Sequence, residues 1–318
     1  MRRALATGAL LLALAGCGGT APAATEAGVV LRDCAGKDVT FPAEPKRVVV
    51  LDGYAAQSLV RLGLGDRITA VGFTKPFAVE KGPIRAELSR LTVLTADTMP
   101  TTELVAAQRP DLVITSASTF GGAPGSPKDA DLTTMDAKGL AACVPAGPMT
   151  TLAATHDFLR RIGKVFRVET RAEQLVAELE ARERAVPAAG VKPRVLILPD
   201  NPVAGQPVPT SGPSTIPGAV VAAAGGENVF GDVQGTRVQV SPEKIVERDP
   251  QVIVVITDYS FAKLEGPALV GAIRANPLLA GTSAVRNGRV LSVSQYLTQF
   301  PSPLNVDAVE QIAAGLRR

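Results

Sequence analysis

Short apolar runs alternate with amphipathic segments along most of the chain. Residues 47–51 and 194–199 are nearly continuous apolar runs, which are typical of strands covered on both faces of a parallel sheet. Segments with helical spacing of apolar residues lie between such runs. This alternation predicts an α/β fold with parallel sheets.

One phrase of this pattern occurs twice. Residues 101–114 read T-T-E-L-V-A-A-Q-R-P-D-L-V-I, and residues 241–254 read S-P-E-K-I-V-E-R-D-P-Q-V-I-V. In both copies a Glu (Glu103, Glu243) opens a short helix, a Pro seven positions later ends it, and an apolar strand follows. K-R-V-V-V-L at 46–51 and P-R-V-L-I-L at 193–198 form a second pair. The repeats predict two lobes of similar plan with a cleft between them, where small ligands commonly bind.

Residues 151–186 have apolar positions at helical spacing, and Gly163 with the V-E-T stretch at 168–170 divides them into two helices. A helix of about 15 to 17 residues from Thr170 would be roughly 25 Å long. Glu178 with Arg182 and Glu180 with Arg184 have the spacing that supports it. We interpret it as a stiff connection that permits modest closure of the lobes.

The other elements are predicted from periodicity and from turn residues. They are helices at 55–62, 132–140, 216–224 and 306–316, strands at 68–73, near 93 and at 142–145, a loop at 116–127, and a hairpin-like Asn-Gly turn at 287–288.

The N-terminus has the pattern of an export signal, with two Arg, a short apolar run and L-A-G-C at 14–17. We expect a signal peptide at 1–16 and a lipid on Cys17, and the alternative is an ordinary signal with an incidental Cys. The predicted organisation is then a lipidated tether (17–27), an N-terminal lobe (28–150), a helical segment (151–189) and a C-terminal lobe (190–318). The protein would be exported and anchored on the outer face of the cytoplasmic membrane.

Composition narrows the classes of partner. Hydrophobic residues make up 46% of the 318 positions and charged residues 20%, which fits a globular protein. The net charge is only +3 and no basic run stands out, so we expect no nucleic-acid partner. We also expect the protein to be a monomer. Cys34 and Cys143 both fall in the first lobe, and export permits a disulfide between them. The alternative is two buried free thiols.

Enzymatic chemistry finds little support. The single His, His156, excludes a His-rich metal site and is expected to be a partly exposed helix residue. Neither a P-loop nor G-x-S-x-G occurs. One alternative is a two-lobed transferase with a catalytic carboxylate at a strand end, Asp52, Asp200 or Asp258. Another is a surface sensor that is read by a receptor.

Six phrases in order resemble the ABC-transporter substrate-binding proteins for ferric siderophores, cobalamin or haem, the class III periplasmic binding proteins. They are P-K-R-V-V-V-L-D at 45–52, L-G-L-G-D-R-I at 62–68, P-T-T-E-L-V-A-A-Q-R-P-D-L-V-I at 100–114, G-G-E-N-V-F at 225–230, V-S-P-E-K-I-V at 240–246 and A-V-R-N-G-R-V at 284–290. The resemblance implies an α/β fold of two Rossmann-like lobes joined by a single long α-helix, with the ligand cleft between the lobes. It implies no enzymatic activity and no cofactor.

The resemblance also gives the two repeat glutamates a role. Glu103 and Glu243 match the positions at which the family meets Arg residues of the permease dimer. Two carboxylates on separate lobes would orient such a complex. The alternative is that each Glu only complements its own helix dipole.

Ligand contacts are expected on the loops that follow the strands. The candidates are Tyr54, Phe73, Lys75, Ser116, Ser118, Thr210, Arg237, Tyr259 and Tyr296. Where the family often has an aromatic residue, six positions before each repeat Glu, this chain has Asp97 and Arg237, and it has no Trp. This departure disfavours cobalamin and haem, and it favours a ferric siderophore that pairs with Arg237 if the chelate is anionic. The alternatives are a surface role for Arg237 and packing roles for the three tyrosines.

Overall fold

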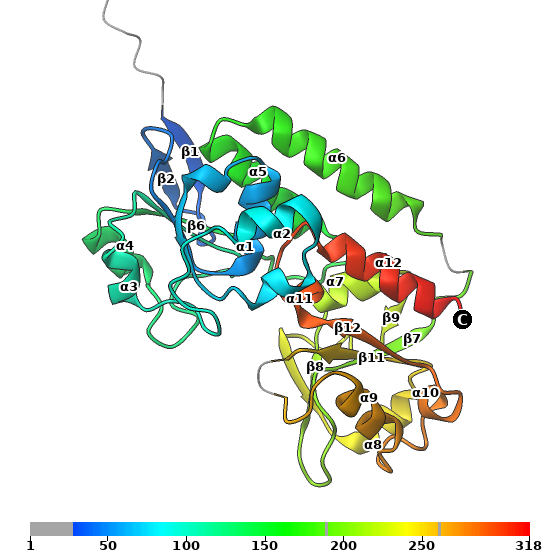
Figure 1. Ribbon diagram of the computed structural model, residues 1–318. Coiled ribbons are helices and arrows are strands. Elements are labelled where there is room, and N and C mark those ends of the chain that lie inside the picture. The colour runs from blue at the N-terminus through cyan, green and yellow to red at the C-terminus, as the bar shows by residue number, and fades with distance from the viewer. Residues whose placement is uncertain (1–27, 188–189, 260–261) are drawn as a thin grey trace, which may run out of the picture.

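Two lobes lie end to end in the computed structural model of the protein, which describes residues 28–187, 190–259 and 262–318. Figure 1 shows the long helix α6 (Glu169–Ala185) running along one side of the molecule, from the first lobe toward the second. The predicted class, two Rossmann-like α/β lobes joined by a long helix, is confirmed. The expected signal peptide, the tether and Cys17 lie outside the described residues.

Each lobe contains a four-stranded parallel sheet, and the strand order is the same in both. The orders are β4-β3-β5-β6 and β9-β7-β11-β12. In chain order, the first strand of each four-stranded sheet therefore lies between the second and the third strand of that sheet. The sheets consist of β3 (Val48–Val50), β4 (Ile68–Val71), β5 (Leu112–Thr115) and β6 (Lys138–Ala141), and of β7 (Arg194–Leu198), β9 (Glu227–Asn228), β11 (Val252–Thr257) and β12 (Val290–Ser294). The runs Val48–Val50 and 252–255 are fully buried, as expected for strands with helices on both faces.

Short helices and two ribbons complete the lobes. The first lobe has α1 (Gly53–Arg61), η1 (Gly65–Arg67), η2 (Lys75–Val79), α2 (Gly82–Leu88), α3 (Thr102–Ala106) and α4 (Asp129–Thr134). The second has α7 (Ile216–Ala223), α8 (Pro242–Arg248), α9 (Gly266–Arg274), α10 (Ser283–Arg286), α11 (Gln295–Thr298) and α12 (Asn305–Leu316). The antiparallel ribbons pair β1 (Val29–Arg32) with β2 (Asp38–Phe41), and β8 (Val208–Ser211) with β10 (Arg237–Val240).

The helical connection contains α5 (Ala153–Val165) and α6, and its predicted division is confirmed. Arg167 between them has a left-handed backbone, with φ of 53°. Gly163 lets the two helices approach closely, because a Cβ there would lie 2.5 Å from the Cβ of Ala172. The break therefore folds α5 back against α6.

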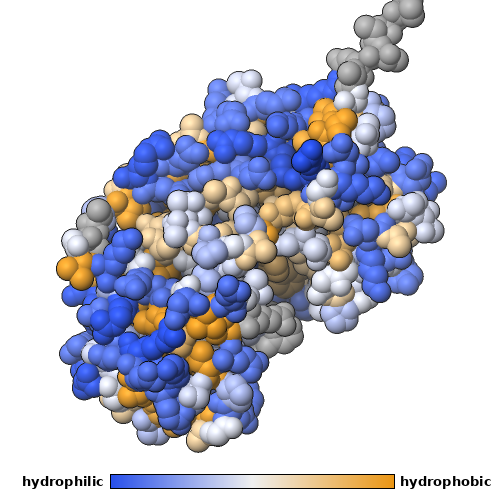
Figure 2. All heavy atoms as spheres, turned by 180° about the vertical axis from the view of Figure 1, so that it is seen from behind, coloured by the Kyte–Doolittle hydropathy of each residue, from blue (hydrophilic) through white to orange (hydrophobic). Residues whose placement is uncertain are grey.

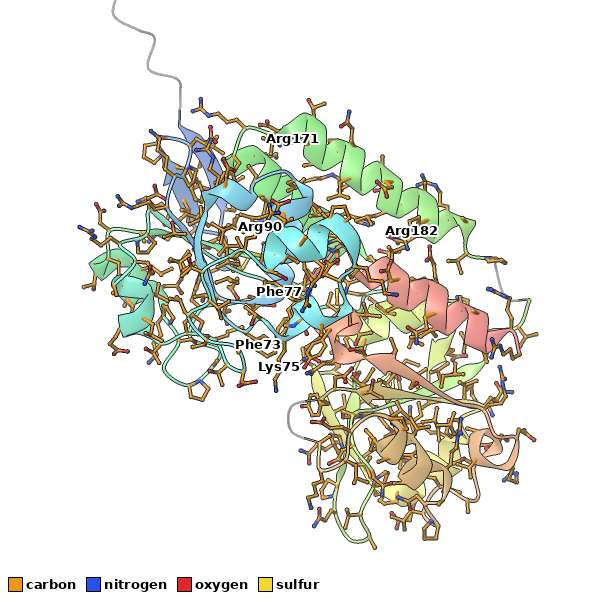
Figure 3. All side chains as sticks on the ribbon, viewed as in Figure 1. Phe73, Lys75, Phe77, Arg90, Arg171 and Arg182 are labelled. Atoms are coloured by element: carbon orange, nitrogen blue, oxygen red, sulfur yellow. A yellow bond between two sulfur atoms is a disulfide. The ribbon has the colours of Figure 1, made fainter. Side chains whose placement is uncertain are left out.

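Helix α6 is attached to both lobes by arginines that Figure 3 labels. Near its start Arg171 donates to the carbonyl of Gly63, and near its end Arg182 contacts Asp307 at 2.6 Å and Glu310 at 2.8 Å on α12. The expected pair of Arg182 with Glu178 is therefore wrong, because α12 supplies two better-placed carboxylates. Arg184 does pair with Glu180, at 3.5 Å.

His156 differs from its expected exposure. It lies on the side of α5 that α6 covers and is only 6% exposed. Its Nε2 lies 2.8 Å from Glu183 and its Nδ1 3.7 Å from Glu180, both on α6. The packing of the two helices buries this residue.

A continuous core crosses the boundary between the lobes. One apolar cluster includes Val48 and Val50 of β3, Phe158 of α5, Val195 of β7 and Val309 of α12. Because the same cluster contains side chains from both lobes and from the connection, the lobes are packed on one another at their base.

Three local predictions need correction. The helix predicted at 132–140 ends at Thr134, and the strand predicted at 142–145 lies earlier, as β6. Gly139 of β6 is required by packing, because a Cβ there would lie 2.7 Å from the ring of Phe120. The Asn-Gly turn at 287–288 joins α10 to β12, which runs parallel to β11, so it forms no hairpin.

Cys34 and Cys143 form a disulfide in the first lobe. Cys34 lies in the turn between β1 and β2, and Cys143 follows β6. The bond therefore attaches the terminal ribbon to the end of the first sheet. Within the described ranges, none of the helices combines the length and the apolar character needed to cross a bilayer.

Candidate functional site

The carboxyl ends of the two sheets meet at the cleft between the lobes. Tyr54 follows β3 of the first lobe, and its hydroxyl donates to the carbonyl of Gln295, which follows β12 of the second lobe, at 3.3 Å. Helix η2, which follows β4, packs against α11. Figure 2 shows the surface hollowed between the lobes, with pale and weakly apolar residues around the hollow.

Three aromatic rings form the floor of this cleft. The ring of Tyr54 lies 6.3 Å from that of Phe73 and 5.3 Å from that of Phe300, the latter edge to face. Tyr54 is fully buried, and burial, followed by the nearby carboxylate of Asp52, raises its pKa well above the usual range. Tyr54 thus belongs to the floor, while the half-buried Phe73 and Phe300 remain partly open. Sequence reasoning missed Phe300, although it lies four residues after Tyr296 beyond the last strand.

Two predicted ligand residues are engaged in the framework instead. Ser116 is fully buried, and its hydroxyl donates to Asp52 at 2.5 Å. Thr210 is 5% exposed, and its hydroxyl donates to the carbonyl of Ile197 at 2.7 Å. Neither hydroxyl is presented to a ligand in this conformation, because each is buried and donates to a polar partner inside the first or the second lobe.

Asp52 explains the burial of Ser116. Its carboxylate accepts from the backbone of Ala55, which caps α1, and from the hydroxyl of Thr115 and the backbone and hydroxyl of Ser116. Burial raises the pKa of Asp52, and these hydrogen bonds act in the opposite direction. The carboxylate ties α1 to the end of β5 and is not open to a substrate, which removes the support for Asp52 as a catalytic group.

The other candidates lie closer to the surface. Ser118 and Tyr259 are half-buried, on the loops after β5 and β11, and Tyr296 is 8% exposed at the start of α11. Burial raises the pKa of Tyr296, and Asp258 and Glu265 act in the same direction. Arg237 begins β10, and its side chain is not among those described. The described residues of this group thus lie on loops or helix starts that follow strands of both lobes.

Lys75 lies where the first lobe meets the second, at the start of η2. Figure 3 places Phe73 and Lys75 at the edge of the first lobe that faces the second. The Nζ of Lys75 lies 3.1 Å from a carboxylate oxygen of Asp97. The hydrogen bond between the Lys75 ammonium and the Asp97 carboxylate raises the pKa of Lys75, and the charges of Tyr296 and Glu265 of the second lobe act in the same direction. We call these four residues, Lys75, Asp97, Glu265 and Tyr296, the mouth of the cleft.

The repeat glutamates lie on the surface in matching positions, Glu103 in the first turn of α3 and Glu243 in the first turn of α8. Both are exposed. A hydrogen bond with the Thr101 side chain lowers the pKa of Glu103. The pKa of Glu243 is lowered mainly by a hydrogen bond from its own backbone N–H and, to a smaller extent, by one from the Ser241 side chain. Both repeat glutamates are therefore ionised and exposed, and Figure 1 shows their helices, α3 on the first lobe and α8 on the second.

A separate cavity of about 610 Å³ lies beside the edge strand β9 of the second lobe, between this lobe and residues 148–150. Two arginines in its lining are already paired: Arg194 donates to the carbonyl of Asp249, and Arg248 contacts the carboxylate of Asp232. Met149 and Pro148 contribute apolar surface. None of the predicted ligand residues lines this cavity. Among the described side chains, no group of three or more His, Cys, Asp or Glu is arranged to hold a metal ion.

The chain is similar to known proteins over most of its length. A profile of the periplasmic binding protein family matches residues 48–297. A cobalamin-binding protein of Halobacterium salinarum is 28% identical over 88% of this chain and 72% of its own. An uncharacterised ABC transporter substrate-binding lipoprotein of Bacillus subtilis is 25% identical over 99% of this chain and 97% of its own.

A solved structure shares the fold. The ABC-type Fe3+-hydroxamate transport protein of Saccharomonospora viridis superimposes with a TM-score of 0.74 and 25% identity, over 90% of this chain and 98% of the other. The family match, the doubled sheet topology and the cleft between the sheets agree with one another. The chain belongs to the periplasmic binding protein family, in the group of ABC-transporter substrate-binding proteins for siderophores, cobalamin and haem.

Proposed function

We propose that this protein captures a ferric siderophore outside the cytoplasmic membrane and delivers it to an ABC-transporter permease for iron uptake. The observation that carries the proposal is the mouth of the cleft, where η2 of the first lobe, which begins at Lys75, packs against α11 of the second lobe, which carries Tyr296. An ammonium and a phenol are both hydrogen-bond donors, which suits the oxygen-rich surface of a ferric chelate. The similarity to an Fe3+-hydroxamate transport protein supports the same ligand class.

Cobalamin is a second candidate, and two observations favour it. One relative is named a cobalamin-binding protein, at 28% identity. The partly open rings of Phe73 and Phe300, which lie beside the buried ring of Tyr54, also give the cleft aromatic surface against which a flat macrocycle could pack. The lack of Trp in the chain reduces the aromatic surface available to such a ligand.

A calorimetric titration separates these candidates. The chain from Gly18 onward is titrated with ferric hydroxamate, catecholate and citrate chelates, with the iron-free chelators, and with cobalamin and haem. Saturable binding of a ferric chelate but not of its iron-free form supports the proposal, and Tyr296→Ala should then weaken binding by about tenfold. Binding of cobalamin or haem alone would replace the siderophore while leaving the transport role in place. Binding of none would favour the sensor.

Delivery to the permease is proposed to depend on Glu103 and Glu243. Both carboxylates are exposed and ionised, so each can pair with a cation of the permease. The double variant Glu103→Gln, Glu243→Gln should lose uptake in cells and keep its ligand affinity. Glu247→Gln is the matched control, because Glu247 is exposed on the same helix as Glu243 and pairs with Lys244 at 2.8 Å. Normal uptake by the double variant would contradict the docking role.

Attachment to the membrane is proposed to occur through a lipid on Cys17. Cys17→Ser should abolish labelling of the protein with a radioactive fatty acid and release it from the membrane fraction. Labelling that persists in Cys17→Ser would show that the lipid, if present, is attached elsewhere.

A further inference from the structure

The ion pair between Lys75 and Asp97 is held in place by the backbone around it. The N–H of Lys75 donates to the carbonyl of Ala96 at 3.3 Å, and the N–H of Phe73 donates to the carbonyl of Thr98 at 3.1 Å. These two bonds join the loop after β4 to the loop that carries Asp97. The 3.1 Å contact between the side chains therefore follows from a fixed arrangement of two loops.

The position of this pair is the entrance to the cleft. Helix η2, which Lys75 begins, packs against α11 of the second lobe. Figure 3 places Lys75 at the edge of the first lobe that faces the second, and the charges of Glu265 and Tyr296 of that lobe act on Lys75. Lys75 and Asp97 are 45% and 72% exposed at their side chains, which leaves both accessible to an entering ligand.

Asp97 also has a defined place in the repeat. It precedes Glu103 by six residues, and Arg237 precedes Glu243 by the same number. The two lobes thus carry opposite charges at equivalent positions of the chain. In the first lobe the carboxylate is directed at Lys75, a cation that would otherwise attract an anionic ligand.

We propose that Asp97 sets the charge preference of the cleft: by pairing with Lys75 it offsets the charge of this ammonium, which keeps N–H groups to donate, so that the protein favours ferric chelates of low net charge over polyanionic ones. The proposal rests on the ferric siderophore function given above and narrows its ligand class to complexes of the trishydroxamate type. Carboxylates of Glu265 and Asp258 near the same opening act in the same direction, since they repel anions.

The size of the effect follows from the exposure of the pair. Exposed ion pairs contribute little, and removing one partner should change the affinity for a charged ligand by about threefold to fivefold. The affinity for an uncharged ligand should change less. The effect should shrink as the ionic strength rises, because salt screens exposed charges.

The test compares the wild-type protein with Asp97→Asn, which keeps the size of the side chain and removes its charge. The probes are three ferric complexes: anionic ferric citrate, neutral ferrichrome and cationic ferrioxamine B, titrated at low and at high salt. Asp97→Asn should bind the citrate complex about threefold to fivefold more tightly and ferrioxamine B more weakly by a similar factor. Ferrichrome should change by less than about twofold, which also shows that the variant is folded.

Asp38→Asn is the matched control. Asp38 pairs with Arg32 at 3.7 Å on the terminal ribbon and is 69% exposed, close to the 72% of Asp97. This variant makes the same change in net charge away from the cleft, and it should leave all three affinities unchanged.

The outcomes separate this proposal from the function on which it rests. If the wild type binds a ferric complex but Asp97→Asn shifts all three affinities equally or not at all, the charge preference is refuted and the siderophore function stands. The same conclusion follows if Asp38→Asn reproduces the shifts. If the wild type binds none of the three complexes but binds a ferric catecholate, the charge preference fails and the siderophore function stands. If it binds no ferric chelate at all, both proposals fail.

Discussion

Arg47 and Arg194 occupy equivalent positions in the two lobes, and each donates a hydrogen bond to an equivalent backbone carbonyl. The Nε of Arg47 donates to the carbonyl of Arg109 at 2.6 Å, and the Nη2 of Arg194 donates to the carbonyl of Asp249 at 2.9 Å. Each acceptor precedes the Pro of the repeated phrase, and both have a left-handed backbone, with φ of 49° and 40°. The repetition thus extends from the sequence pattern to individual hydrogen bonds.

The residue after each repeat Pro gives the first prediction. Asp111 accepts from the backbone N–H groups of Lys46 and Arg47, at 2.9 and 3.0 Å, whereas Gln251 accepts from that of Arg194 alone, at 3.0 Å. Asp111→Ala should therefore lower the free energy of unfolding by about 2 kcal/mol and Gln251→Ala by about 1 kcal/mol, because each lost acceptor leaves a backbone donor without a partner.

Urea unfolding measures this difference through the midpoint, with the slope of the transition unchanged. Asp111→Asn is the control, since its amide oxygen keeps one acceptor, and its cost should be intermediate. Equal costs for the two alanine variants would show that solvent replaces the lost acceptors equally well in both lobes.

The repeat made the architecture predictable from the sequence. Glu103 and Glu243, with the prolines that follow them, mark equivalent helices, and the strands after them pair in parallel with β3 and β7. Apolar runs of this kind specify buried strands because no other position accepts them. The two helices of the connection were predictable for a similar reason, since their periodicity is strong over many residues.

Elements that depend on tertiary contacts were not predictable. The segment K-G-L-A of β6 has little strand character of its own, and it is a strand because it pairs with β5, Leu112 beside Lys138. His156 looked like a surface residue of one helix, but burial depends on α6, which is packed over it. The local sequence pattern does not determine which distant segment packs against a residue.

The site was predicted in part for the same reason. The loops after the strands stay the predicted region for the ligand, and the structure packs η2, which begins at Lys75, against α11, which carries Tyr296. Which hydroxyls face inward depends on the hydrogen bonds of the framework, and those of Ser116 and Thr210 are directed to buried acceptors. The sequence identified the edge of the sheet, whereas the direction of each side chain needed the fold.

Asp52 gives a prediction about pH. Burial raises the pKa of Asp52 in the folded state above the ordinary value of 3.8, which holds for the unfolded chain. At a pH between 3.8 and the raised pKa, the folded protein therefore binds more protons than the unfolded chain. Under linkage, the contribution of Asp52 to stability is then largest below pH 4 and falls as the pH rises toward the raised pKa. The free energy of unfolding should follow this direction.

Asp52→Asn isolates the effect, because Asn does not titrate and all other groups cancel in the comparison. The variant should be less stable by about 1 to 3 kcal/mol, since an amide nitrogen cannot accept the hydrogen bonds from Ser116. Urea unfolding from pH 3 to pH 7 should show the difference from wild type shrinking as the pH rises. A difference that grows with pH would mean that the hydrogen bonds, rather than burial, dominate the pKa of Asp52.

The contact between the lobes gives a third prediction. The hydroxyl of Ser302, in the second lobe, donates to the side-chain oxygen of Gln57 on α1 at 3.0 Å and accepts from the N–H of Leu304. Both Ser302 and Gln57 are fully buried. Ser302→Ala should lower the free energy of unfolding by about 2 kcal/mol, because it leaves buried polar groups without partners.

The lobes should still unfold together, since one apolar cluster includes residues of both. Calorimetry should therefore show a single transition that moves to lower temperature in Ser302→Ala. Ser89→Ala is the control, because the hydroxyl of Ser89 is exposed and bonds only within its own helix. Two separate transitions would show that the lobes are independent despite their shared core.

The disulfide gives the last prediction, and it separates two ways in which a bond can stabilise this fold. Cys34 and Cys143 are 109 residues apart in sequence, and closing so long a loop should stabilise the protein by about 2 to 5 kcal/mol through the unfolded chain. The ribbon of β1 and β2 is also held by Arg161, which donates to the carbonyl of Arg32 at 2.9 Å. Phe41 of the ribbon is 2% exposed and Val29, Leu31 and Val39 pack against the same core, so apolar packing holds the ribbon as well.

If the bond acts on the unfolded chain, Cys34→Ala with Cys143→Ala should lower the global free energy of unfolding by this amount, and hydrogen exchange in the ribbon should rise only in proportion to the global change. If the bond acts locally, the ribbon should detach: its amides should exchange far faster than those of β3, with a smaller global loss. Dithiothreitol should move the wild type toward the variant and leave the variant unchanged. Because Arg161 keeps its contact with the ribbon in both cases, we expect the first result.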